Sequence, residues 1–163
     1  MDGSAGVSAA RAVVLVASTR AASGEYEDRT GPVIAAWLGD RGCEATVRVA
    51  SDGAAFADAL RLAVSDGPEI VITTGGTGIS PTDRTPEATK ALLDYEIPGL
   101  ADAIRRSGEA KVPTAVLSRG VAGVAGRTLV VNLPGSLGGV RDGLGVLDGV
   151  LDHALAQLEG GDH

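Results

Sequence analysis

The chain can be arranged around one stretch, residues 69–90, which reads EIVITTGGTGISPTDRTPEATK. Its first part, residues 70–72, is a short β-branched apolar run that is typical of a strand covered on both faces. A glycine-rich turn follows at residues 73–78, and residues 85–87 (Thr-Pro-Glu) supply an N-cap, a proline at the first helical position and a first-turn acid. The stretch therefore predicts a buried strand, a turn that can hold a ligand, and the start of a helix.

The glycines of this turn, Gly75, Gly76 and Gly78, allow the backbone to bend sharply and to approach a ligand closely. Without a Cβ they can adopt positive φ and direct successive N–H groups into one concavity, as phosphate-binding loops at the carboxyl ends of strands do. The spacing matches neither G-x-x-x-x-G-K-[ST] nor G-x-G-x-x-G, so a purely structural turn remains an alternative. Asp83 and Arg84 follow the turn, and their alternative interpretation is a solvated ion pair or a second N-cap.

Strand and helix patterns alternate along the rest of the chain. Apolar runs predict further strands at residues 12–17, 44–49 and 128–133. Helical spacing of apolar residues predicts helices over residues 32–41, 54–64, 86–93, 98–106 and, without interruption, 144–158. The apolar run at residues 113–117 fits a short helix or a strand equally. The alternation favours the α/β class, with a three-layer α/β/α sandwich built on a mainly parallel sheet.

The length of 163 residues and the hydrophobic content of 44% are enough for one domain with a continuous core. We expect this domain to cover residues 1–163, with residues 1–10 as a flexible N-terminus. No apolar stretch reaches the length of a signal peptide or of a membrane span of roughly 20 residues, so we expect a soluble, cytoplasmic protein with no membrane partner. The single Cys43 cannot form an internal disulfide, and with only His153 and His163 there is no zinc-ligand spacing.

Charge and aromatic content argue against one class of partner. A formal charge of −7 repels a phosphate backbone, and one Phe, one Trp and two Tyr offer few platforms on which bases could stack. We therefore expect no nucleic-acid partner. Backbone N–H groups and a local arginine can still bind a small anion despite the overall charge.

A second glycine-bearing turn, Pro-Gly-Ser at residues 134–136, follows the last predicted strand. If that strand and the strand before the GGTG turn are neighbours in a parallel sheet, both turns open at the edge where such sheets place their ligands. One crevice could then hold two phosphates, with Asp52, Asp83 and the loop at residues 18–30 along its walls. Because carboxylates beside phosphates require a cation, we expect Mg²⁺ held by Asp52 and Asp83. The alternative role for Asp52 is a simple N-cap.

The central stretch closely resembles the signature of the MogA/MoaB family of molybdenum cofactor biosynthesis, which includes the G domain of gephyrin. The resemblance rests on TTGGTG at residues 73–78, on Asp83, and on Thr-Pro-Glu-Ala at residues 85–88. It covers nearly the entire chain in the family's order, through Asp28 with Gly31, Ser118-Arg119, and the Asn-Leu-Pro-Gly-Ser run at residues 132–136. The chain departs from the family pattern at Thr19, Thr30 and Leu137, and the first departure calls one polar contact of the 18–30 loop into question.

The resemblance implies an activity. Members of the family bind molybdopterin and ATP with Mg²⁺ and transfer the adenylyl group to the terminal phosphate of the pterin, with release of pyrophosphate. The resemblance also implies a homotrimer and a downstream molybdenum-insertion protein as a partner. Asp52 and Asp83 become the catalytic acids and the Mg²⁺ ligands. Substrate contacts are implied for Gly75, Gly76, Thr77, Gly78, Ser136, Thr85, Glu87 and Asp28.

Phosphate chemistry narrows the role of the two acids. The second pKa of a phosphate monoester is near ~6, so the attacking oxygen is largely deprotonated at neutral pH and scarcely needs a general base. We therefore interpret the acids as metal ligands or substrate positioners. Two alternative functions remain open. One is a molybdopterin-binding or scaffold protein of the same fold without adenylyl transfer, and the other is an unrelated α/β nucleotide-binding module whose GGTG is only a turn.

Overall fold

The computed structural model describes residues 9–160 and contains one six-stranded sheet. Across the sheet, the strands are β2 (Glu44–Ala50), β1 (Arg11–Ala17), β3 (Ile70–Thr74), β6 (Thr128–Leu133), β5 (Ala122–Ala125) and β4 (Tyr95–Glu96). The first four strands pair in parallel, whereas β5 pairs antiparallel with β6 and with β4. The predicted mainly parallel sheet is confirmed. Most of the expected flexible N-terminus, residues 1–10, lies outside the described residues.

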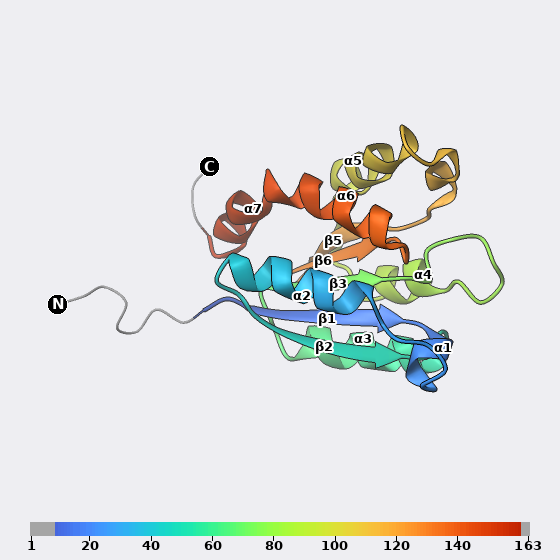
Figure 1. Ribbon diagram of the computed structural model, residues 1–163. Helices are drawn as coiled ribbons and strands as arrows, with labels where there is room; N and C mark the ends of the chain where they lie inside the picture. Colours follow the sequence, from blue (N-terminus) through green and yellow to red (C-terminus); the bar gives the residue numbers. More distant parts are fainter. Residues whose placement is uncertain (1–8, 161–163) are drawn as a thin grey trace.

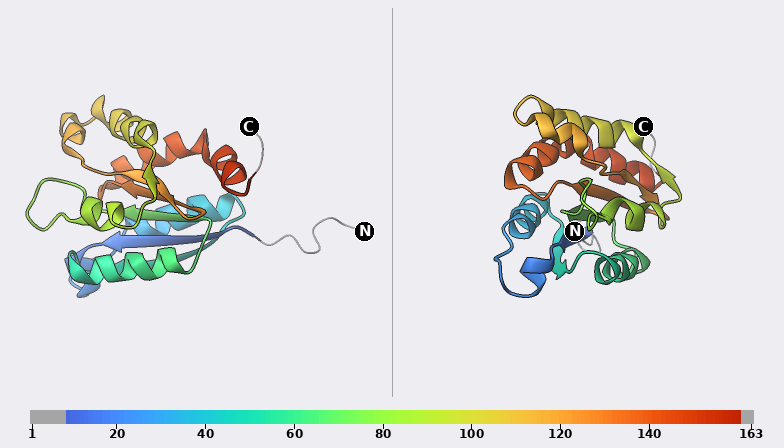
Figure 2. Two further views of the ribbon diagram at one scale, coloured as in Figure 1. Left: turned by 180° about the vertical axis from the view of Figure 1, so that it is seen from behind. Right: turned by 90° about the vertical axis from the view of Figure 1, so that its right-hand side faces the viewer.

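Helices cover both faces of the sheet, which gives the three predicted layers (Figure 1 and Figure 2). One layer contains α2 (Thr30–Asp40), α5 (Pro98–Glu109), α6 (Leu137–Asp148) and α7 (Leu151–Leu158), and the other contains α3 (Ala54–Ser65) and α4 (Thr85–Lys90). The short helix α1 (Thr19–Ala22) follows β1, and the 3₁₀ helix η1 (Pro113–Leu117) follows α5. None of the helices within residues 9–160 has the length and apolar character needed to cross a membrane.

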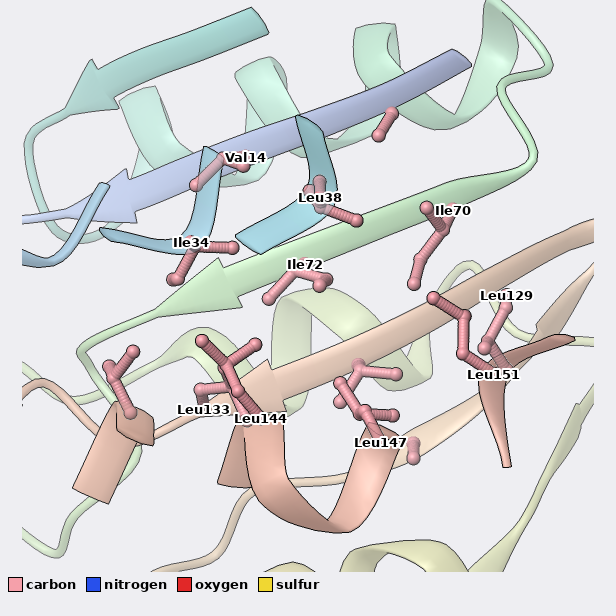
Figure 3. Packing of buried hydrophobic residues seen from close by; sticks show 14 of the residues in the cluster. Val14, Ile34, Leu38, Ile70, Ile72, Leu129, Leu133, Leu144, Leu147 and Leu151 are labelled. Carbon is pink, nitrogen blue, oxygen red and sulfur yellow. The ribbon is translucent and has the colours of Figure 1, made fainter. Parts of the chain in front are cut away.

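Strand β3 lies inside the sheet, and all five of its residues are buried. Ile70 and Ile72 belong to the larger core cluster, where Figure 3 shows them packed with side chains of α2 and α6. Val71 belongs to the cluster on the other face, together with Phe56 and Leu60. Burial of one such side chain stabilises the fold by about 1.5–3 kcal/mol. The strand is therefore held from both sides, which gives the glycine turn that follows it a rigid base.

The prediction of one continuous C-terminal helix is wrong. Helix α6 ends at Asp148 and α7 begins at Leu151, with Gly149 as the C-cap of the first helix and Val150 as the N-cap of the second. Glycine has a low helix propensity, which favours an end at this point. The apolar spacing continues across the break because Leu147 and Leu151 belong to the same core cluster, so periodicity alone could not reveal it.

Shorter elements also differ from the sequence-based expectation. Strands β4 and β5 were not predicted, because two and four residues are too few to show an alternating pattern. The expected loop at residues 18–30 contains α1, in which Ser18 Oγ accepts a hydrogen bond from the N–H of Ala21 at 3.1 Å. Residues 113–117, which fitted either element, form the 3₁₀ helix η1. The helix predicted over residues 86–93 is α4, which starts one residue earlier and ends at Lys90.

Candidate active site

The two glycine turns lie side by side, because the strands that precede them, β3 and β6, are neighbours in the sheet. The register pairs Thr74 with Leu133, so both turns begin at the same level. The N–H of Gly75 donates to the carbonyl oxygen of Leu133 at 3.2 Å, and the Thr74 hydroxyl donates to the carbonyl oxygen of Pro134 at 2.7 Å. The condition for one shared crevice at this edge of the sheet is therefore met.

Gly75 and Gly76 are required by both conformation and space. Their φ angles are +92° and +67°, in the left-handed region that side chains disfavour. A Cβ on Gly75 would lie 2.5 Å from the carbonyl oxygen of Ala17, and a Cβ on Gly76 would lie 2.4 Å from Oγ1 of Thr85. The N–H of Thr85 also donates to the carbonyl oxygen of Gly76 at 3.1 Å, which ties the turn to the start of α4.

Two cavities share a wall formed by Gly135 and Ser136. The larger has a volume of about 630 Å³, lies among α5, η1 and α6, and is also lined by Thr77. The smaller has a volume of about 410 Å³, lies against β1 and α1, and is also lined by Gly75 and Asp28. Both volumes fall in the range of roughly 300–1,000 Å³ that is usual for small-molecule sites. The turn at residues 134–136 therefore stands between two spaces that can each accept a ligand.

The structure brings some of the predicted site residues into these walls and leaves others out. The cavity walls include Gly75, Thr77, Gly78, Ser136 and Asp28. Outside the walls, Gly76 belongs to the GGTG turn itself. Thr85, Asp52 and Asp83 lie beside that turn, and Glu87 pairs with Arg119, which contacts it.

Asp52 does not cap α3. The N-cap of α3 is Gly53, and no side chain bonds to that end of the helix. Instead, Oδ2 of Asp52 accepts hydrogen bonds from the N–H of Thr19 at 3.3 Å and from its hydroxyl at 3.1 Å. Oδ1 lies 3.4 Å from the position that a Cβ on Gly76 would occupy. The N-cap alternative is therefore wrong, and Thr19, which departs from the family pattern, is the partner of this carboxylate.

Asp83 approaches the same turn from the segment before α4. Its Oδ2 accepts a hydrogen bond from the N–H of Ser80 at 3.1 Å and would lie 2.8 Å from a Cβ on Gly78. Among residues 9–160, no group of three or more His, Cys, Asp and Glu side chains could hold a metal ion. A metal at this turn would therefore take some of its ligands from substrate phosphates and water. That donor set fits Mg²⁺, which nucleotide sites commonly hold through one or two carboxylates plus phosphate oxygens.

Glu87 forms an ion pair with Arg119, whose Nη1 lies 2.5 Å from Oε2. The hydrogen bond from Arg119 lowers the pKa of the Glu87 carboxyl, and the same bond raises the pKa of Arg119. The guanidinium also donates from Nε to the carbonyl oxygen of Gly78 at 2.9 Å and from Nη2 to that of Asp83 at 2.8 Å. Arg119 thus connects the GGTG turn with α4, although the sequence assigned it no role in the site.

Asp28 and Ser136 both stabilise the start of a helix. Oδ1 of Asp28 accepts hydrogen bonds from the N–H groups of Thr30 at 3.2 Å and Gly31 at 3.1 Å, at the beginning of α2. Ser136 is the N-cap of α6, and its Oγ accepts a hydrogen bond from the N–H of Gly139 at 3.1 Å. A hydroxyl that accepts one bond still has a proton to donate, so Ser136 can also serve a substrate oxygen.

Basic side chains that the sequence did not assign to the site also line the cavities. Arg20 and Arg29 line the smaller cavity, and Lys111 and Arg141 line the larger one. Nζ of Lys111 is paired with Oδ1 of Asp142 at 2.7 Å. Arg20 and Arg29 lie within residues 18–30, which follow the first strand. Segments at the carboxyl ends of parallel strands often line ligand sites, and the sequence offered no other sign that these two arginines would do so. The walls are therefore locally basic in a chain whose formal charge is −7.

Glycine turns, a helix N-terminus, basic side chains and two carboxylates meet at the carboxyl edge of a mainly parallel sheet. This is the arrangement by which α/β proteins bind phosphorylated ligands. A family described as "Probable molybdopterin binding domain" matches residues 13–153. The chain belongs to the MogA/MoaB family of molybdenum cofactor biosynthesis proteins.

Named relatives support this assignment. A solved molybdopterin biosynthesis Mog protein from Mycobacterium ulcerans is 61% identical, with a TM-score of 0.89 over 92% of this chain and 99% of that chain. The molybdopterin adenylyltransferase of Escherichia coli strain K12 is 36% identical over 140 residues, which are 83% of this chain and 70% of that protein. A molybdenum cofactor biosynthesis bifunctional protein of Synechococcus elongatus is 38% identical over 154 residues, or 93% of this chain and 48% of the relative. The chain thus spans about half the length of such bifunctional relatives.

Proposed function

We propose that this protein is a molybdopterin adenylyltransferase, which joins AMP from ATP to the terminal phosphate of molybdopterin. An oxygen of the pterin phosphate attacks the α-phosphorus of ATP, the bond from that phosphorus to the bridging oxygen breaks, and pyrophosphate leaves. The observation that carries the proposal is the wall that two cavities share at Gly135 and Ser136. Two phosphorylated substrates can meet end to end at that turn. Relatives named molybdopterin adenylyltransferase support the same reaction.

The chain's own groups would act by binding and orientation. Backbone N–H groups of the two glycine turns and of the N-terminus of α6 are available to phosphate oxygens. The guanidinium groups of Arg20 and Arg29 face the smaller cavity and would offset phosphate charge. Phosphoryl-type transfer depends mainly on such positioning and charge neutralisation, so the reaction needs no nucleophilic side chain.

Mg²⁺ belongs to the same proposal. Asp52 and Asp83 would hold it, because each places a carboxylate oxygen beside a glycine of the GGTG turn. When bound with the nucleotide, Mg²⁺ would neutralise charge on the reacting phosphates. The two acids would then act as ligands that position the nucleotide rather than as bases, since the attacking phosphate oxygen is already largely deprotonated near pH 7.

The test is to incubate the purified protein with molybdopterin, ATP and Mg²⁺ and to measure pyrophosphate and the adenylylated pterin. Both products should appear in equal amounts, and neither should form when any one component is omitted. Hydrolysis of ATP that does not depend on molybdopterin, or the absence of both products, would contradict the proposal.

A second candidate function is molybdopterin binding or scaffolding without adenylyl transfer. It is favoured by one observation, which is that neither Asp52 nor Asp83 is part of the cavity walls. A binding site could therefore be complete without the two acids. Saturable molybdopterin binding in titrations, together with no pyrophosphate in the incubation above, would select this function.

Assembly and partners complete the proposal. We propose that the chain forms a homotrimer, acts in the cytoplasm where ATP is available, and passes its product to a molybdenum-insertion protein. Sedimentation equilibrium should then give a mass about three times that of one chain. A concentration-independent monomer would contradict the trimer without affecting the proposed reaction.

A further inference from the structure

The segment between β3 and α4 projects beyond the end of the sheet, as Figure 1 and the left view of Figure 2 show. Residues 79–84 of this segment, which carry Asp83, are called the Asp83 loop below. Ile79 at its start is 68% exposed. Within the loop, the N–H of Asp83 donates to the carbonyl oxygen of Ser80 at 2.9 Å, and the N–H of Ser80 donates to Oδ2 of Asp83. These bonds shape the loop but do not attach it to the rest of the protein.

Arg119 supplies that attachment. Its Nε donates to the carbonyl oxygen of Gly78 at 2.9 Å, directly before the loop, and its Nη2 donates to the carbonyl oxygen of Asp83 at 2.8 Å. Its Nη1 contacts the carboxylate of Glu87 on α4. The backbone of Arg119 is anchored to the same turn, because its main-chain N–H donates to the carbonyl oxygen of Thr77 at 2.7 Å. One side chain therefore connects both ends of the Asp83 loop with α4.

We propose that Arg119 is a positioning residue that fixes the Asp83 loop and so holds the Asp83 carboxylate beside the GGTG turn. The inference rests on the proposed adenylyl transfer. It assigns a role in that reaction to Arg119, which lines neither cavity. The planar fork of a guanidinium can donate to several acceptors at fixed angles, which the single ammonium of lysine cannot reproduce. The Arg119–Glu87 pair is partly solvated, with side chains 36% and 47% exposed, so its removal should loosen the loop more than it destabilises the whole fold.

The expected kinetic signature is a loss of kcat with little change in KM. A misplacement of about 1 Å at a reacting group lowers the rate roughly a hundredfold, and Arg119→Ala should approach that loss. Arg119→Lys should remain defective because it keeps the charge but not the fork. Since Arg119 acts through Asp83, adding Arg119→Ala to Asp83→Asn should lower kcat little further than Asp83→Asn alone.

The experiment combines hydrogen–deuterium exchange with adenylyl-transfer kinetics on the full chain. In Arg119→Ala, exchange should rise in residues 79–84 while the strands stay protected. The control is Arg61→Ala, which removes another arginine–carboxylate pair, the more exposed pair of Arg61 with Asp58 at 2.8 Å on α3, and should change neither measurement.

Each outcome decides a separate point. Unchanged exchange in residues 79–84 of Arg119→Ala, a kcat close to that of the unsubstituted protein, or additive losses with Asp83→Asn would overturn the inference. If the unsubstituted protein forms no adenylylated pterin, the proposed function is overturned instead. In that case the exchange data still decide whether Arg119 holds the loop.

Discussion

Gly76→Ala should destabilise the protein through two effects that the structure separates. The residue has φ of +67°, and a left-handed backbone costs a residue with a Cβ about 1–2 kcal/mol. The new Cβ would also lie 2.4 Å from Oγ1 of Thr85, which is only 2% exposed and cannot turn into solvent. Overpacking of this kind costs about 1–3 kcal/mol. The free energy of unfolding should therefore fall by roughly 2–5 kcal/mol in total.

Two other glycines provide matched controls. Gly126 has φ of +62° and nothing within 4 Å of its missing Cβ, so Gly126→Ala should show the backbone cost alone. Gly39 lies within α2 with nothing within 4 Å, so Gly39→Ala should stabilise the protein by up to about 1 kcal/mol. Urea unfolding of the three variants measures these terms. The difference between Gly76→Ala and Gly126→Ala is the overlap with Thr85, and equal losses in the two variants would refute the reasoning.

The remaining predictions concern polar side chains of the site. Ser136→Ala should cost about 1 kcal/mol of stability through loss of the α6 cap, measured by urea unfolding. It should weaken molybdopterin binding roughly threefold to tenfold in titrations, and a loss of several orders of magnitude would indicate another role. Asp83→Asn should keep molybdopterin binding while adenylyl transfer falls steeply and recovers partly at high Mg²⁺, whereas a defect insensitive to Mg²⁺ would exclude the metal role. Asp52→Asn should behave like Asp83→Asn, and normal transfer would remove Asp52 from the reaction. Because Arg119 lowers the pKa of Glu87, the stabilising effect of this pair is present above the ordinary value of 4.5 and is lost as pH falls below it. Glu87→Gln should therefore be less stable than the unsubstituted protein at pH 7 and should converge with it in acid, and a difference that persists at low pH would contradict the pairing.

Elements that local pattern specifies could be predicted. The β-branched run at residues 70–72 predicted a strand buried on both faces, and β3 is buried at every position. The glycines after it were expected to be able to take positive φ, and Gly75 and Gly76 do so, whereas Gly78 does not. Strands β4 and β5 were missed because their pairing is set by the antiparallel neighbour rather than by their own composition. The break at Gly149 was missed for a related reason, since the helices on both sides of it contact one core.

Side-chain contacts between distant segments were beyond the sequence. Thr19 contacts Asp52 because the parallel strands β1 and β2 pair Ala17 with Ala50 at their ends. Thr19 comes two residues after Ala17, and Asp52 comes two residues after Ala50. Both strands were predicted, but the sequence did not show that they are neighbours or in which register. Arg119 is 32 residues from its partner Glu87, and no periodicity links the two. The sequence could thus suggest Asp52 and Asp83 as candidate acids, while the side chains that contact them and their loop could not be predicted.

The glycine turn at residues 75–78 also limits how substitutions in the site can be interpreted. Its missing Cβ atoms point at three groups from different segments, the carbonyl oxygen of Ala17, the hydroxyl of Thr85 and the carboxylate of Asp83. An added side chain would therefore push β1, α4 or the Asp83 loop before it met a ligand, and a binding defect would report distortion as well as lost contact. Ser136 avoids this problem, because its side chain can be shortened without meeting a neighbour. Its capping bond contributes a stability loss that unfolding measures separately, so the remaining change in affinity reports on the ligand itself.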